Sequence, residues 1–398
     1  MKCGYLIFKN LPKSLSSIYT FLSYFIKMVA TQLSQQINPL YDTSIHFFDN
    51  VRAGPRSLTV EEVTYIEQLR EDINNLESQG VSLRRELFPD VVIQSPLGIP
   101  AGIAYGSKFL ELYRQLGYGF ETQKTVRDGF WKGNPMPHIV YLEEGNYTDG
   151  FTATETPNRL LVSNSFGIHC FGTSEWEPDI GLFIVKYPDT PTIVSGVVTL
   201  GTDKKEVIRQ YSEIGKRAKR IGASAYEVNV SCPNEMEGHS GEIQDDTGLC
   251  REIVQETKHQ SGLPLLIKIG YRPPEILRKF VRHVGDVVDG IVGINTMPAV
   301  VRRRDGSYAY GDRRPRAGVS GERLKPYAEE VLETLLSLRK DFGDSYIIIS
   351  VGGVTEPSDV SKRLDMGAHA VESAATAMSY PPFGLEVKKH LLERELEK

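Results

Sequence analysis

The sequence predicts an α/β protein built on a single (β/α)₈ barrel with an N-terminal helical extension. From Val91 onward, short apolar runs alternate with longer amphipathic runs, which is the pattern of a parallel sheet with crossover helices. The chain has 398 residues, a length that suits one barrel of about 250 residues with extensions. Apolar residues make up 40% and charged residues 24%, the ordinary balance of a globular protein.

Eight short apolar runs are the expected barrel strands. They are Ile99–Ile103, Gly119–Thr125, Thr192–Val198, Ala225–Val230, Leu265–Ile269, Gly290–Asn295, Tyr346–Val351 and Ala370–Ser373. Between them, Lys204–Ile221 and Leu324–Leu338 repeat apolar residues at three- and four-residue steps, so each predicts a helix that covers the outside of the barrel. Glycines punctuate the helix-to-strand turns, as expected for a left-handed helix end, at Gly117, Gly222, Gly262 and Gly367.

The chain divides into three predicted parts: residues 1–55 as a leader, 56–90 as an N-terminal helical segment, and 91–398 as the barrel. Thr59–Leu87 carries helical periodicity. Met1–Tyr41 contains four lysines and no acidic residue, and its apolar stretch is short and broken by serines. Two interpretations stay open, an upstream extension with the true start at Met28 or a membrane or organelle address. If this segment carries no such address, a cytoplasmic location is expected.

Charge and cysteine content exclude several classes of protein. The net charge of -5 gives no general attraction to nucleic acid. Four cysteines lie far apart without CxxC spacing, so neither a disulfide framework nor a zinc site is indicated, and a reducing compartment fits best. His169 and Cys170 are adjacent, but no second ligand pair lies nearby in the sequence. We therefore expect them to be packing residues, and no metal site.

Polar residues follow the predicted strands at the end where barrel enzymes carry their chemistry. Lys124 ends the second strand, Lys268 lies in the fifth, and Asn295 and Thr296 follow the sixth. The fourth strand runs into Glu227-Val-Asn-Val-Ser-Cys-Pro-Asn234, in which two amides flank a thiol. Amides can hold a planar ring through paired donors and acceptors, and a thiol can move a proton on it. For a lone cysteine, packing as a small hydrophobe is the alternative.

This Asn-Val-Ser-Cys-Pro-Asn run resembles the catalytic segment of the dihydroorotate dehydrogenase family. A cysteine at this place is similar to the soluble class, whereas the membrane-associated class carries serine. The resemblance implies that Cys232 is the catalytic base and that Asn229 and Asn234 bind the substrate.

Other segments resemble the family in the same order along the chain. The substrate contacts that they imply are Lys124, Asn164, Gly167, Ile168, Asn295 and Thr296, with Phe166 in place of the family's methionine. Lys268 resembles the family lysine beside the reactive edge of the flavin, where a cation can stabilise negative charge. A barrel-interior ion pair is the alternative role for Lys268.

The same resemblance implies FMN as the cofactor. Its expected contacts are Ala101, Gly102, Lys124, Thr125, Lys268, Ser320, Gly321, Gly352, Gly353 and Thr376. Glycines let backbone N–H groups approach a phosphate closely, and the loops after the last barrel strands are the usual phosphate seat. At the eighth strand, Ala374-Ala375-Thr376 replaces the family's Gly-Thr contact, which leaves Thr376 as the expected donor.

The implied function is oxidation of dihydroorotate to orotate in pyrimidine biosynthesis. Cys232 takes the C5 proton while hydride passes from C6 to the flavin. The segment Glu235–Ser240 departs from the family's Pro-Gln-Leu-Ala-Tyr pattern, so another dihydropyrimidine or an enoyl-type ring stays open as the substrate. The replacement at Ala374-Ala375 leaves open a third interpretation, a flavin barrel that binds without turnover.

The resemblance also implies an electron acceptor and an oligomeric state. No iron–sulfur cluster spacing or nicotinamide motif occurs in the sequence, and the soluble class implies a small acceptor such as fumarate and a homodimer. Six arginines and two tyrosines lie between Arg302 and Arg316. Such mixtures can bind single-stranded nucleic acid, but the interspersed Asp305 and Asp312 favour a solvated hairpin beside the site, which can steer anionic substrate.

Overall fold

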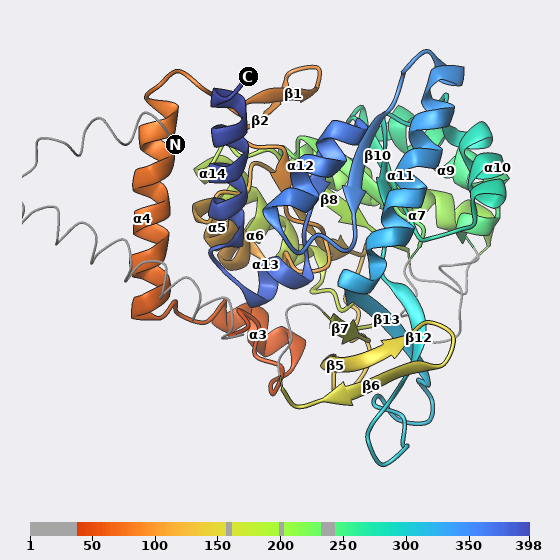
Figure 1. The fold of residues 1–398 in the computed structure, drawn as a ribbon. Helices are drawn as coiled ribbons and strands as arrows, with labels where there is room; N and C mark the ends of the chain where they lie inside the picture. The colour runs from red at the N-terminus through yellow and green to blue at the C-terminus, as the bar shows by residue number, and fades with distance from the viewer. Residues whose placement is uncertain (1–37, 157–160, 199–202, 232–242) are drawn as a thin grey trace, which may run out of the picture.

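The computed structural model describes residues 38–156, 161–198, 203–231 and 243–398. Its centre is an eight-stranded parallel sheet in the order β3-β15-β14-β11-β10-β9-β8-β4. Its two end strands meet through the parallel bridge between Ile99 and Glu121, which closes the sheet into a barrel (Figure 1). The fold is therefore the predicted (β/α)₈ barrel. The strands are β3 Leu97–Gly98, β4 Glu121–Val126, β8 Thr192–Gly196, β9 Ala225–Asn229, β10 Leu265–Ile269, β11 Gly290–Gly293, β14 Ile347–Val351 and β15 Ala370–Glu372.

Helices follow the barrel strands and cover them from outside. They are α5 Ser107–Gln115, α6 Thr173–Lys186, α7 Lys204–Arg220, α9 Thr247–Ser261, α10 Pro274–Val284, α11 Lys325–Arg339, α12 Pro357–Met366, α13 Ala375–Ser379 and α14 Phe383–Leu396. Helix α7 shows how the sequence specifies them. Asp203 caps its N-terminus, its apolar face buries Val207, Tyr211 and Ile214, and three basic residues lie in its last turn.

The register of the parallel strands brings the predicted polar residues together. Strand β10 pairs with β9 so that Lys268 lies beside Asn229, and with β11 so that Lys268 lies beside Val292. Parallel strands in a barrel end at the same rim. Residues far apart in the sequence therefore gather at the carboxyl end of the barrel.

The N-terminal segment differs from the predicted single helix over Thr59–Leu87. Helix α4 (Val60–Glu77) begins with a capping box between Thr59 and Glu62. It ends before Gly80, whose φ of +89° suits only glycine at low cost. The chain then forms an antiparallel hairpin of β1 Arg85–Phe88 and β2 Val91–Ile93. Its buried side chains pack against strand residues such as Phe120 and Leu266, so the hairpin covers one end of the barrel.

A second, smaller sheet lies at the opposite end of the barrel from this hairpin (Figure 1). It contains β5 Ile139–Asn146, β6 Gly150–Thr154, β7 Leu161–Asn164, β12 Met297–Arg302 and β13 Arg316–Gly321, joined as β12-β13-β7-β5-β6 with β12 also paired to β6. The sequence analysis did not predict it. Its strands come from two insertions more than a hundred residues apart, and strand pairing over such a separation leaves no local pattern.

The arginine-rich segment is only partly the solvated hairpin that the sequence suggested. Strands β12 and β13 do pair antiparallel, and Arg302, Arg303 and Arg304 are exposed. However, Arg314 and Tyr310 are buried. Arg314 donates to the carbonyl oxygen of Ser165, which anchors the small sheet to the loop after β7.

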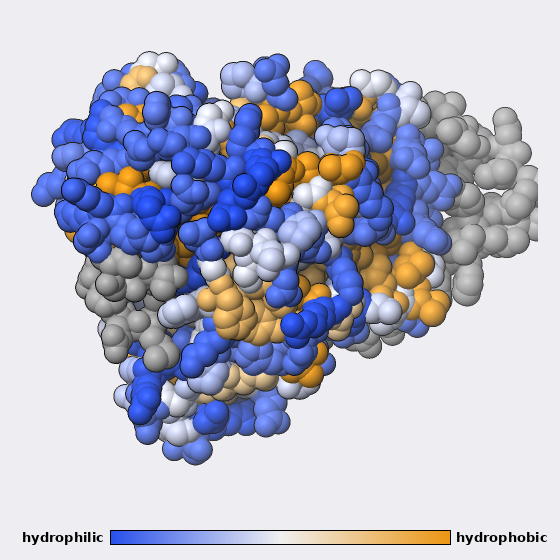
Figure 2. Space-filling model, turned by 180° about the vertical axis from the view of Figure 1, so that it is seen from behind, coloured by the Kyte–Doolittle hydropathy of each residue, from blue (hydrophilic) through white to orange (hydrophobic). Residues whose placement is uncertain are grey.

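Before the barrel, α3 (Phe47–Ala53) packs through Phe47 against Phe166 in the loop after β7, and α4 lies alongside α14 (Figure 1). The pair α4–α14 is held by a hydrogen bond from Tyr65 to Glu386 and by an ion pair between Lys389 and Asp72. Within the described residues, no helix is both long enough and apolar enough to cross a bilayer. Seen from behind, the surface is largely hydrophilic, with hydrophobic areas in separate patches (Figure 2).

Candidate functional site

Two small cavities lie side by side at the carboxyl end of the barrel. The first, of about 80 Å³, is lined by Ala101, Gly102, Lys124, Thr125, Asn164, Phe166, Gly167, Ile168, Asn229, Lys268, Asn295 and Thr296. The second, of about 70 Å³, shares four of these residues and adds Ser320, Gly321, Gly352 and Gly353 among others. Nearly every described residue that the sequence analysis assigned to the site therefore lines one connected region.

Lys124 occupies one side of the first cavity. It projects from β4, is 7% exposed, and its Nζ donates to the carbonyl oxygen of Gly102. The ammonium lies 4.1 Å from the ring centroid of Phe166 and 4.9 Å from that of Tyr105, within the range of cation–π attraction. Aromatic faces and a carbonyl thus hold the charge in place beside the cavity.

An amide and hydroxyl network forms the floor. Asn229 donates to the hydroxyl of Thr125 at 3.2 Å, and that hydroxyl lies 3.1 Å from Ser195 Oγ. Asn229 Oδ1 accepts from the amide of Ser231, and Asn295 Nδ2 donates to the carbonyl oxygen of Ser231. Because each side chain is fixed by a neighbour, the amides are held in defined orientations before any ligand binds.

The interior below this floor carries buried charge. Lys268 Nζ lies 3.9 Å from a carboxylate oxygen of Glu227, and the two side chains are 4% and 0% exposed. Glu372, fully buried, accepts a hydrogen bond from Thr122 at 2.9 Å. Burial raises the pKa of Glu372 to about 7, while the positive charge of Lys268 acts in the opposite direction. The sequence analysis did not single out either carboxylate, because a glutamate inside a strand gives no sign of which way it faces.

We expect Glu372→Gln to stabilise the protein more at about pH 8 than at about pH 5. The folded state holds the Glu372 proton more tightly than the unfolded chain does, so stability is lost as the pH rises from the ordinary glutamate value to about 7. Glutamine mimics the protonated form and removes this loss. The measurement is the difference in Tm between variant and parent at both pH values, with the exposed Glu397→Gln as the control. A difference that is equal at both pH values would contradict it.

The second cavity is built around a glycine cradle. Gly352 and Gly353 follow β14 with φ of +106° and +71°, and a Cβ on Gly353 would lie 2.3 Å from the backbone nitrogen of Lys325. The loop after β15 completes the wall with Ser373, Ala374 and Ala375. Backbone N–H groups in the loops after the last two barrel strands are the usual seat of a phosphate, so these residues fit the phosphate end of FMN.

Thr376 does not join this wall. Its hydroxyl donates to the carbonyl oxygen of Val354 at 3.0 Å, and the residue is fully buried. Ala374 and Ala375 line the cavity in its place. The Thr376 hydroxyl, which the sequence analysis expected to donate to the cofactor, therefore donates to the protein backbone.

The loop after β7 closes the first cavity from the side. Gly167 and Ile168 both have positive φ, at +65° and +49°, and a Cβ on Gly167 would collide with Asn134. Buried Arg127 holds this loop, because its Nε donates to Ile168 O and its Nη1 to Val198 O. The sequence analysis missed Arg127, since an arginine after a strand more often reaches solvent.

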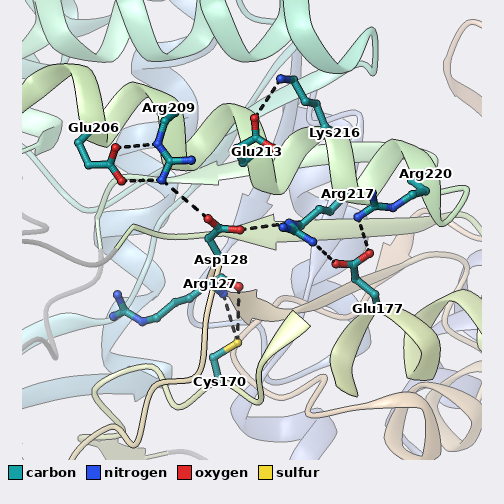
Figure 3. Close-up of polar contacts among 10 residues, drawn as sticks. All are labelled: Arg127, Asp128, Cys170, Glu177, Glu206, Arg209, Glu213, Lys216, Arg217 and Arg220. Atoms are coloured by element: carbon teal, nitrogen blue, oxygen red, sulfur yellow. Dashed lines mark hydrogen bonds and ion pairs between the residues drawn. The ribbon is translucent and has the colours of Figure 1, made fainter. Parts of the chain in front are cut away.

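An ion-pair network fixes the chain on the other side of Arg127. Asp128 pairs with Arg217 at 3.1 Å, and Arg217 and Arg220 both pair with Glu177 (Figure 3). The close-up shows Arg127 pointing away from this network while its backbone contacts the sulfur of Cys170. The segment after β4 is thus tied to α7 and α6, which keeps Lys124 and Thr125 in register with the floor.

Cys232 and Asn234 lie outside the described residues, between Ser231 and Ile243. Two further features escaped the sequence analysis. A third cavity, of about 330 Å³, borders the first through Lys124 and Thr125 and is lined by α3, α5 and α6. Beside it, His46, His138 and His169 come together from separate segments and form what we call the histidine cluster. No spacing in the sequence could reveal the cluster, because its members are 31, 92 and 123 positions apart.

The comparisons with known proteins point to one family. A family model described as dihydroorotate dehydrogenase matches residues 85–395. Among curated relatives, a dihydroorotate dehydrogenase of Dictyostelium discoideum is 25% identical over 87% of this chain and 95% of its own length.

Other relatives differ in the acceptor that their names give. A dihydroorotate dehydrogenase (quinone) of Halorhodospira halophila is 28% identical over 73% of this chain and 80% of its own. A dihydroorotate dehydrogenase A (fumarate) of Lactobacillus helveticus is 27% identical over 69% and 80%. A crystal structure of DHODH in complex with ferulenol from Eimeria tenella superposes with a TM-score of 0.62, covers 87% of this chain and 95% of that one, and is 18% identical, which supports the fold.

Proposed function

The chain belongs to the dihydroorotate dehydrogenase family, whose model matches it from residue 85 to 395, and from this premise we propose that it is an FMN-dependent oxidoreductase that converts dihydroorotate to orotate in pyrimidine biosynthesis. The observation that carries the proposal is the gathering of Lys124, Lys268 and the amides of Asn229 and Asn295 around one cavity at the carboxyl end of the barrel. Two cations suit an anionic substrate, and amides suit a ring with amide edges.

In this proposal the side chains divide the work of binding. Asn164, Asn229, Asn234, Asn295 and Thr296 hold the ring, together with the backbone of Gly167 and Ile168. Lys124 contacts both substrate and cofactor. Because Asn229 and Asn295 are held through Thr125 and Ser231, their donors and acceptors are oriented before the substrate arrives.

The proton step belongs to Cys232, which takes the C5 proton of the substrate. Cys232 directly follows Ser231. The amide of Ser231 donates to Asn229 and its carbonyl oxygen accepts from Asn295, so the residue before the proposed base is fixed beside the cavity. Bound FMN supplies the acceptor for the C6 hydride. Lys268 Nζ lies 3.9 Å from Glu227, and the residue lines both cavities. Its positive charge therefore lies beside both the substrate contacts and the cofactor contacts.

The cofactor contacts follow the two cavities. Ala101, Gly102, Thr125 and Lys268 face the first, and Ser320, Gly321, Gly352 and Gly353 face the second, where the phosphate would lie. We expect the backbone around Ala374 and Ala375 to replace the Thr376 hydroxyl. For the acceptor we propose a small molecule such as fumarate, and for the assembly a homodimer.

The deciding experiment is the visible spectrum of the purified protein before and after anaerobic addition of dihydroorotate. We expect a yellow protein whose flavin band bleaches. A yellow protein that does not bleach would favour another dihydropyrimidine or an enoyl-type substrate, and a colourless protein that takes up no FMN would favour a retired barrel. Reoxidation by fumarate supports the acceptor proposed here, whereas reoxidation by a short-chain quinone alone would overturn it.

We expect Gly353→Ala to weaken FMN binding at least about tenfold. The new Cβ would meet Lys325 N at 2.3 Å in a backbone conformation that costs L-residues about 1–2 kcal/mol, and about 1.4 kcal/mol corresponds to a factor of ten. FMN binding is followed by flavin fluorescence in a titration of the apoprotein. Gly343→Ala is the matched control, because Gly343 has a φ of +62° but no atom within 4 Å of the added Cβ. Equal affinities of the two variants would remove Gly353 from the cofactor site.

A further inference from the structure

The histidine cluster brings together three imidazoles from separate parts of the fold. His46 precedes α3, His138 precedes β5, and His169 lies in the loop after β7. The nitrogen atoms that they offer lie no more than 4.8 Å from one another. Ligands of tetrahedral zinc lie about 3.3 Å apart for bonds of about 2.0–2.1 Å, so the widest pair has to close by at most about 1.5 Å. His46 is half-buried and can supply this movement.

Two of the imidazoles have buried nitrogens without a hydrogen bond of ordinary geometry. His169 is 1% exposed, and neither of its ring nitrogens makes a hydrogen bond of ordinary geometry with a described residue. His138 is equally buried, and its Nδ1 lacks a partner. Leaving a buried polar atom unpaired costs about 1–3 kcal/mol, so such atoms point to a missing ligand.

His138 has the contacts of a metal ligand. Its Nε2 lies 3.0 Å from the carbonyl oxygen of Asn134, which can only accept, so the proton resides on Nε2 and the lone pair on Nδ1. A ligating histidine ordinarily donates its second nitrogen to such a carbonyl. His46 is bound less firmly, because its Nδ1 accepts a 3.4 Å hydrogen bond from the amide of Phe48, a long contact that an ion would displace.

The aromatic neighbours cover ring faces of the cluster, and the three imidazoles meet one another in edge-to-face contacts. Phe47 stacks on His169 at 4.9 Å and 24°, and Phe166 stacks on His138 at 5.3 Å and 28°. The three imidazoles themselves meet at 69° to 82° with centroids 4.5 to 5.0 Å apart. In each of these contacts one ring directs an edge, where nitrogens lie, toward its neighbour, in keeping with the 4.8 Å limit between the ligand atoms. Gly133 lets the chain pass against His169, since a Cβ there would lie 2.5 Å from its ring.

The sulfur next to this cluster is otherwise engaged. Cys170 Sγ donates to the carbonyl oxygen of Phe171 at 2.8 Å and accepts from the amide of Arg127. The ligand set is therefore three imidazoles, with a fourth tetrahedral position left for water.

We propose that His46, His138 and His169 bind one divalent transition-metal ion of the zinc type. Imidazole ligands suit such ions, whereas Mg²⁺ and Ca²⁺ require oxygen ligands. The positive charges of Lys124 and of Arg314, near His138, oppose any cation, so coordination rather than charge holds the ion.

The site would connect the segment before α3 to the small sheet and to the loop that closes the first cavity. Packing of aromatic rings joins the segment of His46 to the other two, whereas His138 and the loop after β7 also share a backbone hydrogen bond from Ser165 N to His138 O. An ion bound only by the folded protein stabilises it by mass action. The ion is therefore a structural clamp on the N-terminal segment, distinct from the proposed flavin chemistry.

The test is zinc content and thermal stability of the full-length protein with its flavin. After equilibration with zinc chloride and dialysis, we expect about one zinc per chain by elemental analysis. We also expect Tm to rise by about 3–4 °C when free Zn²⁺ is about 100 times its dissociation constant, and not with Mg²⁺. His46→Asn removes an imidazole but keeps a good N-cap for α3, and His169→Phe fills its volume beside Phe47. Both should lose the zinc and the zinc-dependent rise in Tm.

His259→Asn, on the exposed face of α9, is the matched control and should behave like the parent. The proposal is overturned if His46→Asn and His169→Phe retain as much zinc as the parent. It is equally overturned if the parent holds none, or if Mg²⁺ raises Tm as much as Zn²⁺ does. Flavin content, measured in parallel, keeps this result separate from the test of the proposed reaction.

Discussion

Cys232→Ser should retain FMN but slow its reduction by dihydroorotate about 100- to 10,000-fold, the usual effect of losing a general base. A thiol has an unperturbed pKa of about 8.5, whereas an alcohol stays protonated throughout the working range and accepts a proton poorly without further help. The amide N–H of Ser231 donates to Asn229, and its carbonyl oxygen accepts from Asn295. These contacts fix Ser231, so the substitution at the next residue should leave the floor of the cavity intact. Rapid mixing under anaerobic conditions measures the rate of flavin bleaching.

Cys250→Ser is the control for this experiment. Cys250 is buried in α9, and its thiol donates to the carbonyl oxygen of Ile243, a contact that serine can keep. We expect this variant to bleach at the parent rate. Bleaching of Cys232→Ser at that same rate would show that the base is a different residue.

Lys268→Met should lower both the stability of the fold and the rate of flavin reduction. Removing one member of a buried ion pair typically costs about 3–5 kcal/mol, because the other charge is left without a partner. Here that charge is Glu227, whose carboxylate makes no hydrogen bond among the described residues and lies 3.9 Å from Lys268. Urea unfolding and the anaerobic bleaching rate measure the two effects separately.

The double variant Lys268→Met/Glu227→Gln distinguishes a role in the reaction from one in the ion pair alone. Neutralising Glu227 removes the unpaired charge, so most of the lost stability should return. If Lys268 also acts at the flavin, bleaching stays slow in the double variant. Recovery of both stability and rate would reduce Lys268 to a barrel-interior ion-pair partner, the alternative that its strand position already raised.

The barrel itself could be predicted because its strands are buried on both faces. Short apolar runs such as Gly290–Gly293 are typical of parallel strands, and seven of the eight predicted strands overlap the observed ones, with shifts of a few residues at their ends. The first strand was displaced most, since β3 is only Leu97–Gly98 and the residues after it form a turn. Residues at the strand ends then gathered as expected, because topology alone brings them to one rim.

Features that depend on long-range pairing could not be predicted. The small sheet joins two segments that are separated along the chain by four of the eight barrel strands, and the histidine cluster joins residues from three separate segments. The burial of Glu227 and Glu372 and the inward turn of Arg127 depend on which face of a strand or loop meets the interior. Thr376 shows the reverse case, in which a residue expected from the family pattern gives its hydroxyl to Val354.

The pairing of α4 with α14 also bears on how the chain is made. Tyr65 and its partner Glu386 are 321 positions apart. At about 5–20 residues per second, a ribosome needs roughly 15–60 s to produce the partner after Tyr65 has emerged. During that interval the apolar side of α4, with Ile66, Leu69 and Ile73, has no C-terminal helix to cover it. Nascent chains therefore leave this apolar side without its C-terminal partner until the last helix has been made.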